Sequence, residues 1–361
     1  MTEGGADGAA VITVWPAVAR PVRRRRRWWP MIVGLSISLV VVVGAAALVM
    51  FDRPGPVAGL GRVFPYPPPN NLAFVDSANT SAAIDAAKNT AERMFSIGYR
   101  SFDQDIARAT PLLTGAALAK YQRLIAELRG PTVAAHLNVT SMVINNGLLS
   151  LAQNGTGQRA TALVVLRLAG HHQDTGKTDY DVQMLQLAEQ RNNKGDWRVS
   201  DIADQPGSAI PAVPPMDPLP LSVPGLAADI ATQRDIVLAT AEHDAVTLVN
   251  LDYRSAQQSL NSWLAVSTGT LYSDIAGKQA SEISRAQADQ SVATGVVQAG
   301  AVSVLGLDAG TATVLVIARV TASEHGAAPT TAYIPMEISM TRTSSGIGWQ
   351  ASDMYVPPPN A

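Results

Sequence analysis

The residues best suited to chemistry lie in one short segment, 171–181, which reads HHQDTGKTDYD. It holds ligand types for zinc or another divalent cation, namely His171, His172, Asp174, Asp179 and Asp181. The segment is expected to join two strands, however, and Asp-Thr-Gly-Lys within it is typical of a turn. His136, His243 and His325 are isolated, and no H-E-x-x-H motif is present. We therefore expect no metal site here.

A second segment, 155–160, reads GTGQRA and mimics a dinucleotide-binding loop. It is expected to join strand to strand instead of opening a helix, so the phosphate cradle cannot form. Neither a G-x-S-x-G elbow nor a G-x-x-x-x-G-K-[ST] loop occurs. The absence of cysteine excludes thiol catalysis, iron–sulfur clusters and disulfides. We expect no catalytic, cofactor-binding or metal-binding residue, and we interpret the protein as a non-enzyme without a cofactor.

The N-terminal part predicts a membrane anchor. Residues 31–51 contain no charged side chain, and at 1.5 Å per residue this length spans roughly 31 Å of hydrocarbon. Five consecutive arginines, Arg23 to Arg27, precede the segment, so the positive-inside rule places the basic tail, 1–30, in the cytoplasm. A cleavable signal peptide is the alternative, but its apolar region would be shorter. We expect a single-pass cell-membrane protein whose remaining residues are extracytoplasmic.

The formal charge is −2 for the whole chain and +4 for residues 1–30, so the part that follows the apolar segment carries −6. A net negative globular part without a basic stripe lacks the electrostatic footprint of a nucleic-acid-binding protein. Two proline-rich stretches, 52–71 and 206–224, are typical of semi-rigid linkers. They delimit two predicted domains, 72–205 and 225–356.

The two predicted domains are interpreted as copies of one unit, because matching residues recur at an almost constant offset. Tyr99-Arg100-Ser101 returns as Tyr253-Arg254-Ser255 at an offset of 154, and Gly147 answers to Gly300 at 153. The offset is 152 for three later pairs, which are Arg167 and Arg319, Trp197 and Trp349, and Asp201 and Asp353.

Within each copy, the hydrophobic pattern predicts helices first and strands after. In the first copy a helix begins at Asp76 or Ser77, a short one spans 102–109, and a third begins at Thr114-Gly115 and ends at Gly130-Pro131. Four strands follow at 137–151, 159–169, 178–190 and 196–202. The second copy predicts helices at 226–250, 256–266 and 270–286, and strands at 292–305, 311–322, 331–343 and 348–355. Helices followed by an antiparallel meander indicate an α+β fold of the cone-shaped, nuclear-transport-factor-2-like (NTF2-like) kind.

The recurring polar and aromatic residues predict structural roles. We expect Tyr99, Arg100 and Asp103, with Tyr253 and Arg254, to form buried networks that join helices to sheet. Direct contact with a partner is the alternative role. Trp197 and Trp349 lie on the closing strand of each unit, where a large aromatic side chain should fill the core between sheet and helix. Each copy should bury its own core and fold alone, and the exposed sheet edges and helix faces of both should offer docking surfaces.

Several motifs together resemble the Mce-associated membrane proteins of actinobacteria. They are the basic tail and apolar segment, Y-R-S-F-D-Q-D-I-A-R-A, T-G-A-A-L-A-K-Y, an N-x-G turn between strands, A-T-A-L-V-V-L-R and D-W-R-V-S-D-I. The resemblance covers residues 23–205 and implies an accessory protein of an Mce-type lipid transport system in the cell envelope. The second copy of the unit departs from that family. One transmembrane helix followed by tandem domains of this fold also resembles the inner-membrane scaffold proteins of Gram-positive conjugation machines, which are type IV secretion-like.

The expected function is therefore that of a non-catalytic, membrane-anchored scaffold in a multi-protein envelope complex. Lipid transport is the main interpretation and conjugation-type secretion the alternative. The third alternative is an ectodomain that binds a lipid or another small ligand, because folds of this kind can hold an apolar pocket. The expected partners are the membrane, subunits of a transport or secretion complex and possible lipid, with no nucleic acid.

Overall fold

The computed structural model describes residues 71–154, 157–203, 225–343 and 348–357. The predicted basic tail 1–30, the membrane segment 31–51 and the linker 206–224 lie outside these residues, as does the linker 52–71 except for Asn71. Among the described helices, none is both long enough and apolar enough to cross a membrane. The two described halves are called unit 1 (71–203) and unit 2 (225–357).

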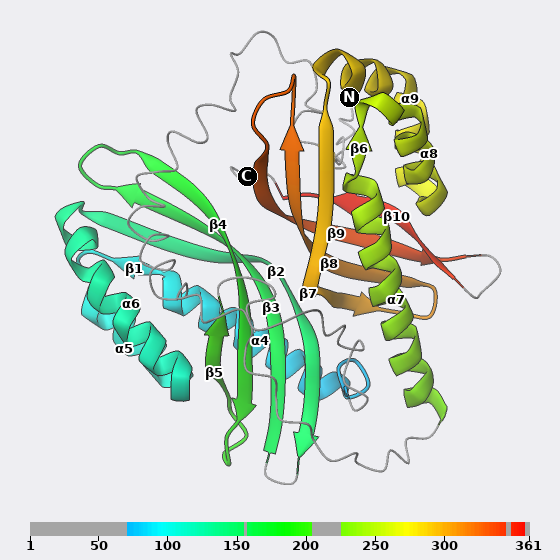
Figure 1. Ribbon diagram of the computed structural model, residues 1–361. Helices are drawn as coiled ribbons and strands as arrows, with labels where there is room; N and C mark the ends of the chain where they lie inside the picture. Colours follow the sequence, from blue (N-terminus) through cyan, green and yellow to red (C-terminus); the bar gives the residue numbers. More distant parts are fainter. Residues whose placement is uncertain (1–70, 155–156, 204–224, 344–347, 358–361) are drawn as a thin grey trace, which may run out of the picture.

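Unit 1 has an α+β architecture in which three helices precede a four-stranded antiparallel meander (Figure 1). Its helices are α4 (Ser77–Phe95), α5 (Phe102–Ala109) and α6 (Gly115–Ala134), and its long strands are β2 (Leu137–Asn154), β3 (Gly157–His172), β4 (Thr178–Arg191) and β5 (Trp197–Ala203). A two-residue strand, β1 (Ile97–Gly98), pairs with β2, and a 3-10 turn, η2 (Thr110–Leu112), leads toward α6.

Unit 2 repeats this order of elements. Its helices are α7 (Gly225–Val249), α8 (Ala256–Val266) and α9 (Gly269–Asp289), and its long strands are β7 (Val292–Leu307), β8 (Thr311–Ser323), β9 (Thr330–Arg342) and β10 (Trp349–Tyr355). The short strand β6 (Leu251–Asp252) pairs with β7 as β1 pairs with β2, and η3 (Tyr253–Ser255) precedes α8. The predicted α+β class and the predicted antiparallel meanders are confirmed.

Helix ends follow local chemistry with one exception. Asp76 caps α4, because its Oδ1 accepts a hydrogen bond from the backbone N–H of Asn79 at 3.1 Å. The predicted end of α6 at Gly130-Pro131 is wrong, since the helix continues to Ala134. Proline removes one hydrogen-bond donor, but the backbone N–H of Ala135 still bonds to the carbonyl of Pro131 at 3.0 Å. The last turn therefore closes beyond the proline.

The strands of the described residues form one continuous sheet in the order β10-β9-β8-β7-β2-β3-β4-β5. Unit 1 joins unit 2 in the middle, where Leu148 of β2 pairs with Val304 of β7. One face of each half of the sheet packs against the unit's own first helix, α4 or α7. Each unit thus has a core of its own, built around side chains such as Ala87 and Leu166 in unit 1 and Ala241 and Val316 in unit 2.

A third apolar cluster combines both units on the opposite, outer faces of the sheet. Leu163 and Val165 of β3 lie in it with Ala301 of β7, and Leu315 and Ile317 of β8 complete it. All five side chains are buried. The expectation of two modules separated by a spacer is therefore wrong for the described residues, because the units share this cluster as well as the sheet.

The sheet edges also differ from the expectation of exposed docking edges. The backbone N–H of Thr114 donates to the carbonyl of Val199 on edge strand β5 at 2.8 Å. At the other edge, the N–H of Thr268 donates to the carbonyl of Ala351 on β10, also at 2.8 Å. Each edge is thus partly covered by the segment that opens the unit's third helix, which limits edge-to-edge pairing with other chains.

Candidate functional site

The segment 171–181 forms the end of the β3–β4 hairpin, as its turn residues predict. Its polar side chains form two separate contact groups, one around Asp179 and one at Asp174. His172 Nε2 lies 3.4 Å from Asp179 Oδ2, Lys177 Nζ lies 2.7 Å from Asp179 Oδ1, and Asp174 contacts His136 Nδ1 at 2.8 Å. Within the described ranges, no three His, Asp or Glu side chains gather closely enough to hold a metal ion.

The prediction that the Tyr–Arg networks are buried is wrong. Arg100 and Arg254 are exposed, and each guanidinium stacks over the ring of the preceding tyrosine, at 5.2 Å from the Tyr99 centroid and 4.6 Å from that of Tyr253. Asp103 is also exposed and pairs with Arg129. A guanidinium keeps its hydration while its planar group covers an aromatic face, so the pair needs no buried partner.

The predicted role of the two closing tryptophans is confirmed. Trp197 and Trp349 are buried in the cores of unit 1 and unit 2. Trp349 Nε1 also lies 3.3 Å from Gln233 Oε1 on α7, which ties the last strand to the first helix of unit 2.

Two repeated glycines, Gly147 and Gly300, lie at the junction between the units. Gly147 is inside β2, as the predicted strand 137–151 requires. A Cβ at this position would lie 2.5 Å from Ser303 Oγ and 2.8 Å from the Val304 carbonyl, so only glycine lets β7 approach. Gly300 has φ +78°, and its carbonyl accepts a hydrogen bond from Gln186 Nε2 of unit 1 at 2.7 Å.

A buried arginine forms a second link between the units. Arg234 of α7 donates from Nη1 to the carbonyls of Asn71 and Ala73, both at 2.8 Å. Asn71 in turn is bound to β2, since its Nδ2 donates to the Leu149 carbonyl and its Oδ1 accepts from the Leu151 N–H. The first residues of unit 1 are therefore held between its own sheet and the first helix of unit 2.

Each unit buries one carboxyl group. Glu189 of β4 is 2% exposed and neither of its carboxyl oxygens has a hydrogen-bond partner, so burial raises its pKa well above the ordinary value. Asp244 of α7 is 3% exposed, and burial raises its pKa to about 7, opposed in part by a backbone hydrogen bond from Ala351. Buried carboxyls with raised pKa values occur in active sites, but these two face separate cores and no nucleophile or base accompanies them in the described contacts.

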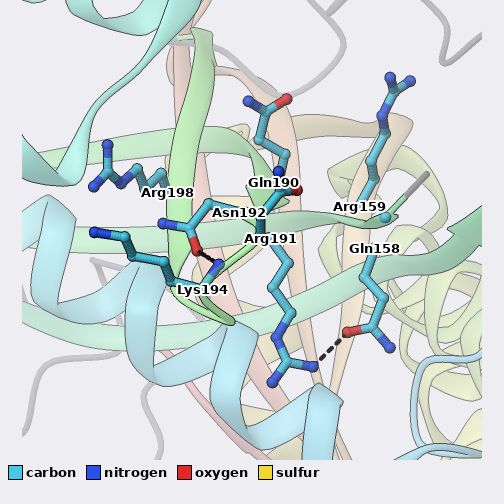
Figure 2. Close-up of a pocket in the computed structure, with 9 residues that line it drawn as sticks. Gln158, Arg159, Gln190, Arg191, Asn192, Lys194 and Arg198 are labelled. Carbon is cyan, nitrogen blue, oxygen red and sulfur yellow. Dashed lines mark hydrogen bonds between the residues drawn. The ribbon is translucent and has the colours of Figure 1, made fainter.

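A hollow of about 570 Å³ opens at the end of the unit 1 sheet, around the β4–β5 hairpin. Its lining includes four cationic side chains, Arg159, Arg191, Lys194 and Arg198, and no carboxylate. Figure 2 shows Arg159 and Gln190 extending on one side of the strands and Arg191 and Gln158 on the other. The lining is polar throughout, so the hollow suits an anion and not an acyl chain.

The outer faces of the sheet carry a further feature that recurs in both units. Arg167 of β3 is flanked across the sheet by Met142 and Val182, and Arg319 of β8 is flanked by Val296 and Tyr333. Met142 is 46% exposed and Val296 49% exposed. Neither arginine has an ion-pair partner among the described residues.

Sequence reasoning missed Arg234 and the cationic hollow. Arg234 has no counterpart in unit 1, where Thr80 occupies the position 154 residues earlier, so the repeat gave no signal. Arg159 was present in the rejected loop motif, but only the pairing of β3, β4 and β5 brings it to the same end of the sheet as Arg198.

No protein-family model matches this chain, and no curated protein matches it. Solved structures do show similarity. A periplasmic fragment of TraM is 15% identical, with 36% of this chain and 98% of that chain covered and a TM-score of 0.31. An IcmL-like type IV secretion system protein from Legionella pneumophila is 10% identical, with 40% and 96% covered and a TM-score of 0.30.

A third solved structure, described as an NTF2-like protein involved in plasmid conjugation, is similar over more of the chain. It is 10% identical, with 78% of this chain and 98% of that chain covered and a TM-score of 0.24. Similarity at these TM-scores assigns neither a family nor a function to this chain.

Proposed function

We propose that the protein is a non-catalytic scaffold subunit of a cell-envelope complex, held by an N-terminal membrane helix with both units outside the membrane. The observation that carries the proposal is the junction, which turns two copies of one fold into a single body. A shared sheet, a shared apolar cluster and the Arg234 clamp fix one copy against the other. Two units held in one fixed arrangement can position the other subunits of a complex, and this role needs no catalytic residue.

The repeated patches on the outer faces supply the contact surface. Each combines an exposed apolar side chain with an arginine that has no ionic partner in the described part of the chain. The pairs are Met142 beside Arg167 in unit 1 and Val296 beside Arg319 in unit 2. Arginine and methionine are enriched at protein interfaces. Two similar patches on one anchored body favour a multi-subunit partner, because the second contact forms at a raised effective concentration.

Two kinds of complex remain candidates. The sequence motifs resemble Mce-associated proteins and favour a lipid transport system, in which the protein would be an accessory subunit. The duplication favours a conjugation-type secretion machine, and the solved structures described above include proteins of that class. A ligand-binding ectodomain is the third candidate, supported by the polar hollow in unit 1.

Photo-crosslinking in the native cell tests the scaffold proposal. A photoreactive residue at Met142 or Val296 should capture the same membrane complex, identified by mass spectrometry. Val133, which is 44% exposed on α6, is the matched control position. Capture of a permease or Mce-domain subunit supports lipid transport, and capture of a coupling ATPase or relaxase supports secretion. Labelling at Met142 and Val296 that does not exceed labelling at Val133 refutes the proposal.

The membrane orientation needs a separate test, because it rests on residues 1–51. A reporter that is active only after export should be active when fused after Ala361, and a cytoplasmic reporter should be inactive there. The opposite pair of results would place both units in the cytoplasm and remove the envelope complex from consideration.

A further inference from the structure

The cationic hollow of unit 1 is built on a row of three side chains across the sheet. Arg159 of β3 pairs with Gln190 of β4, and Gln190 pairs with Arg198 of β5. Paired residues of neighbouring strands project from the same face, and adjacent strands lie about 4.8 Å apart. The two arginines therefore start roughly 10 Å apart with an amide between them. Both arginines line the hollow, one on each side of Gln190.

Unit 2 shows that the fold does not need these arginines. The same row in unit 2 is Thr311 of β8, Thr341 of β9 and Gln350 of β10, joined by the same pairings. The two end positions of the row are neutral in unit 2 and cationic in unit 1. Unit 2 forms the same strand pairings without arginines at these positions. Arg159 and Arg198 are therefore better explained by a ligand than by a role in folding.

The charges of the hollow are not neutralised by nearby carboxylates. Arg191 is held by neutral oxygens, since Nη1 donates to Asn79 Oδ1 and Gln158 Oε1 and Nε donates to the Gly195 carbonyl, each at 2.8 Å. Asp196 of the hairpin is bound by Asn192 Nδ2 at 3.1 Å and does not line the hollow. The hollow is thus a positive site within a chain whose part beyond the apolar segment is net negative.

We propose that this hollow binds a phosphate-bearing anion, with Arg159 and Arg198 as its principal ligands. Guanidinium groups match the oxygens of phosphate in two-point hydrogen bonds. The volume of about 570 Å³ lies within the range of roughly 300 to 1,000 Å³ that small-molecule sites occupy. The phosphate can belong to a lipid headgroup or to a free phosphate compound, and the polar lining excludes the acyl chains themselves. This binding is independent of the scaffold role.

Titration calorimetry on the full chain in nanodiscs of phosphatidylcholine tests the proposal. The probes are inorganic pyrophosphate, which represents the free anion, and dihexanoyl phosphatidylglycerol below its micelle concentration, which represents the headgroup. The variant R159T/R198Q replaces both arginines by the residues of unit 2, so its fold is expected to persist. The control R93Q/R123Q removes the same charge from exposed positions of α4 and α6, outside the hollow and outside the patches of the outer sheet faces.

We expect saturable binding of at least one probe, weakened at least tenfold in R159T/R198Q and less than twofold in R93Q/R123Q. The single variant R198Q should weaken binding at least threefold. It replaces R159T/R198Q as the test variant if the double variant does not fold. Binding of pyrophosphate alone assigns the site to a free phosphate, and binding of the phosphatidylglycerol alone assigns it to a headgroup. Absence of saturable binding of both probes, or an equal loss in the control, overturns the proposal.

Discussion

Replacing Gly147 by alanine should weaken the junction between the two units. The new Cβ would lie 2.5 Å from Ser303 Oγ, 2.8 Å from the Val304 carbonyl and 2.9 Å from Leu305 Cδ2. Ser303 can rotate its hydroxyl, but the Val304 carbonyl belongs to the strand pair that joins the units. Overpacking of this kind costs about 1–3 kcal/mol. The lower entropy of the unfolded chain offsets roughly 0.4–1 kcal/mol of that loss.

The expected net loss is about 1–2 kcal/mol in the free energy of unfolding. Urea denaturation of a fragment spanning 71–357 measures it, with tryptophan fluorescence as the signal. Trp197 reports on unit 1, and Trp263 and Trp349 report on unit 2. Replacing Trp197 by phenylalanine in a parallel series leaves only the signal of unit 2.

Gly277→Ala is the matched control, because an added Cβ there meets no atom within 4 Å and the position lies inside α9. Alanine in a helix is about 1 kcal/mol more favourable than glycine, so this variant should gain stability. The double variant G147A/S303A should recover part of the loss, since it removes the contact with the hydroxyl. Equal stability of G147A and the parent protein would refute the close approach of β2 and β7.

Three further variants test the buried polar groups. Asp244→Thr, which copies Thr90 of unit 1, should stabilise the protein by up to about 4 kcal/mol at pH 8 and by little at pH 3.5. A carboxyl whose folded pKa is raised destabilises increasingly as pH rises from its unfolded value of 3.8 to about 7, so urea midpoints across this range check the sign. Glu189→Met, which copies Met340 of unit 2, should likewise raise the midpoint at pH 7 and change it less at pH 4. Arg234→Met leaves two buried carbonyls without their donor and should lower the free energy of unfolding by about 2–4 kcal/mol, measured in the same assay.

The sequence was sufficient to predict the local elements of both units. Helices and strands of the described residues begin and end within a few residues of the prediction, because their hydrophobic periodicity, caps and glycine-rich turns act over short distances. The end of α6 was misjudged because a proline in the last helical turn removes a hydrogen bond without stopping the chain from turning. The exposure of Arg100 and Arg254 was misjudged because recurrence alone does not distinguish a buried arginine from one stacked on a tyrosine.

The candidate site required pairing information that the sequence does not carry. Arg159 and Arg198 are separated by 38 other residues in the chain and meet only through the register of three strands. The internal repeat then helps through a difference between the two copies and not through a similarity. Once Thr311 and Gln350 are known to occupy the same row in unit 2, the two arginines stand out as a difference between copies that the fold leaves unexplained.

The junction, in contrast, had a signal in the sequence. Residues 162–166 read ALVVL and residues 314–318 read VLVIA. A strand with one wet face alternates apolar and polar side chains, whereas an uninterrupted apolar run indicates burial on both faces. The inner faces are covered by α4 and α7, so the outer faces needed a second cover. In each unit that cover is the other unit, through Leu163 and Val165 on one side and Leu315 and Ile317 on the other. The apolar runs therefore predict association of the copies, and a proline-rich connection is no evidence that the domains it joins are apart.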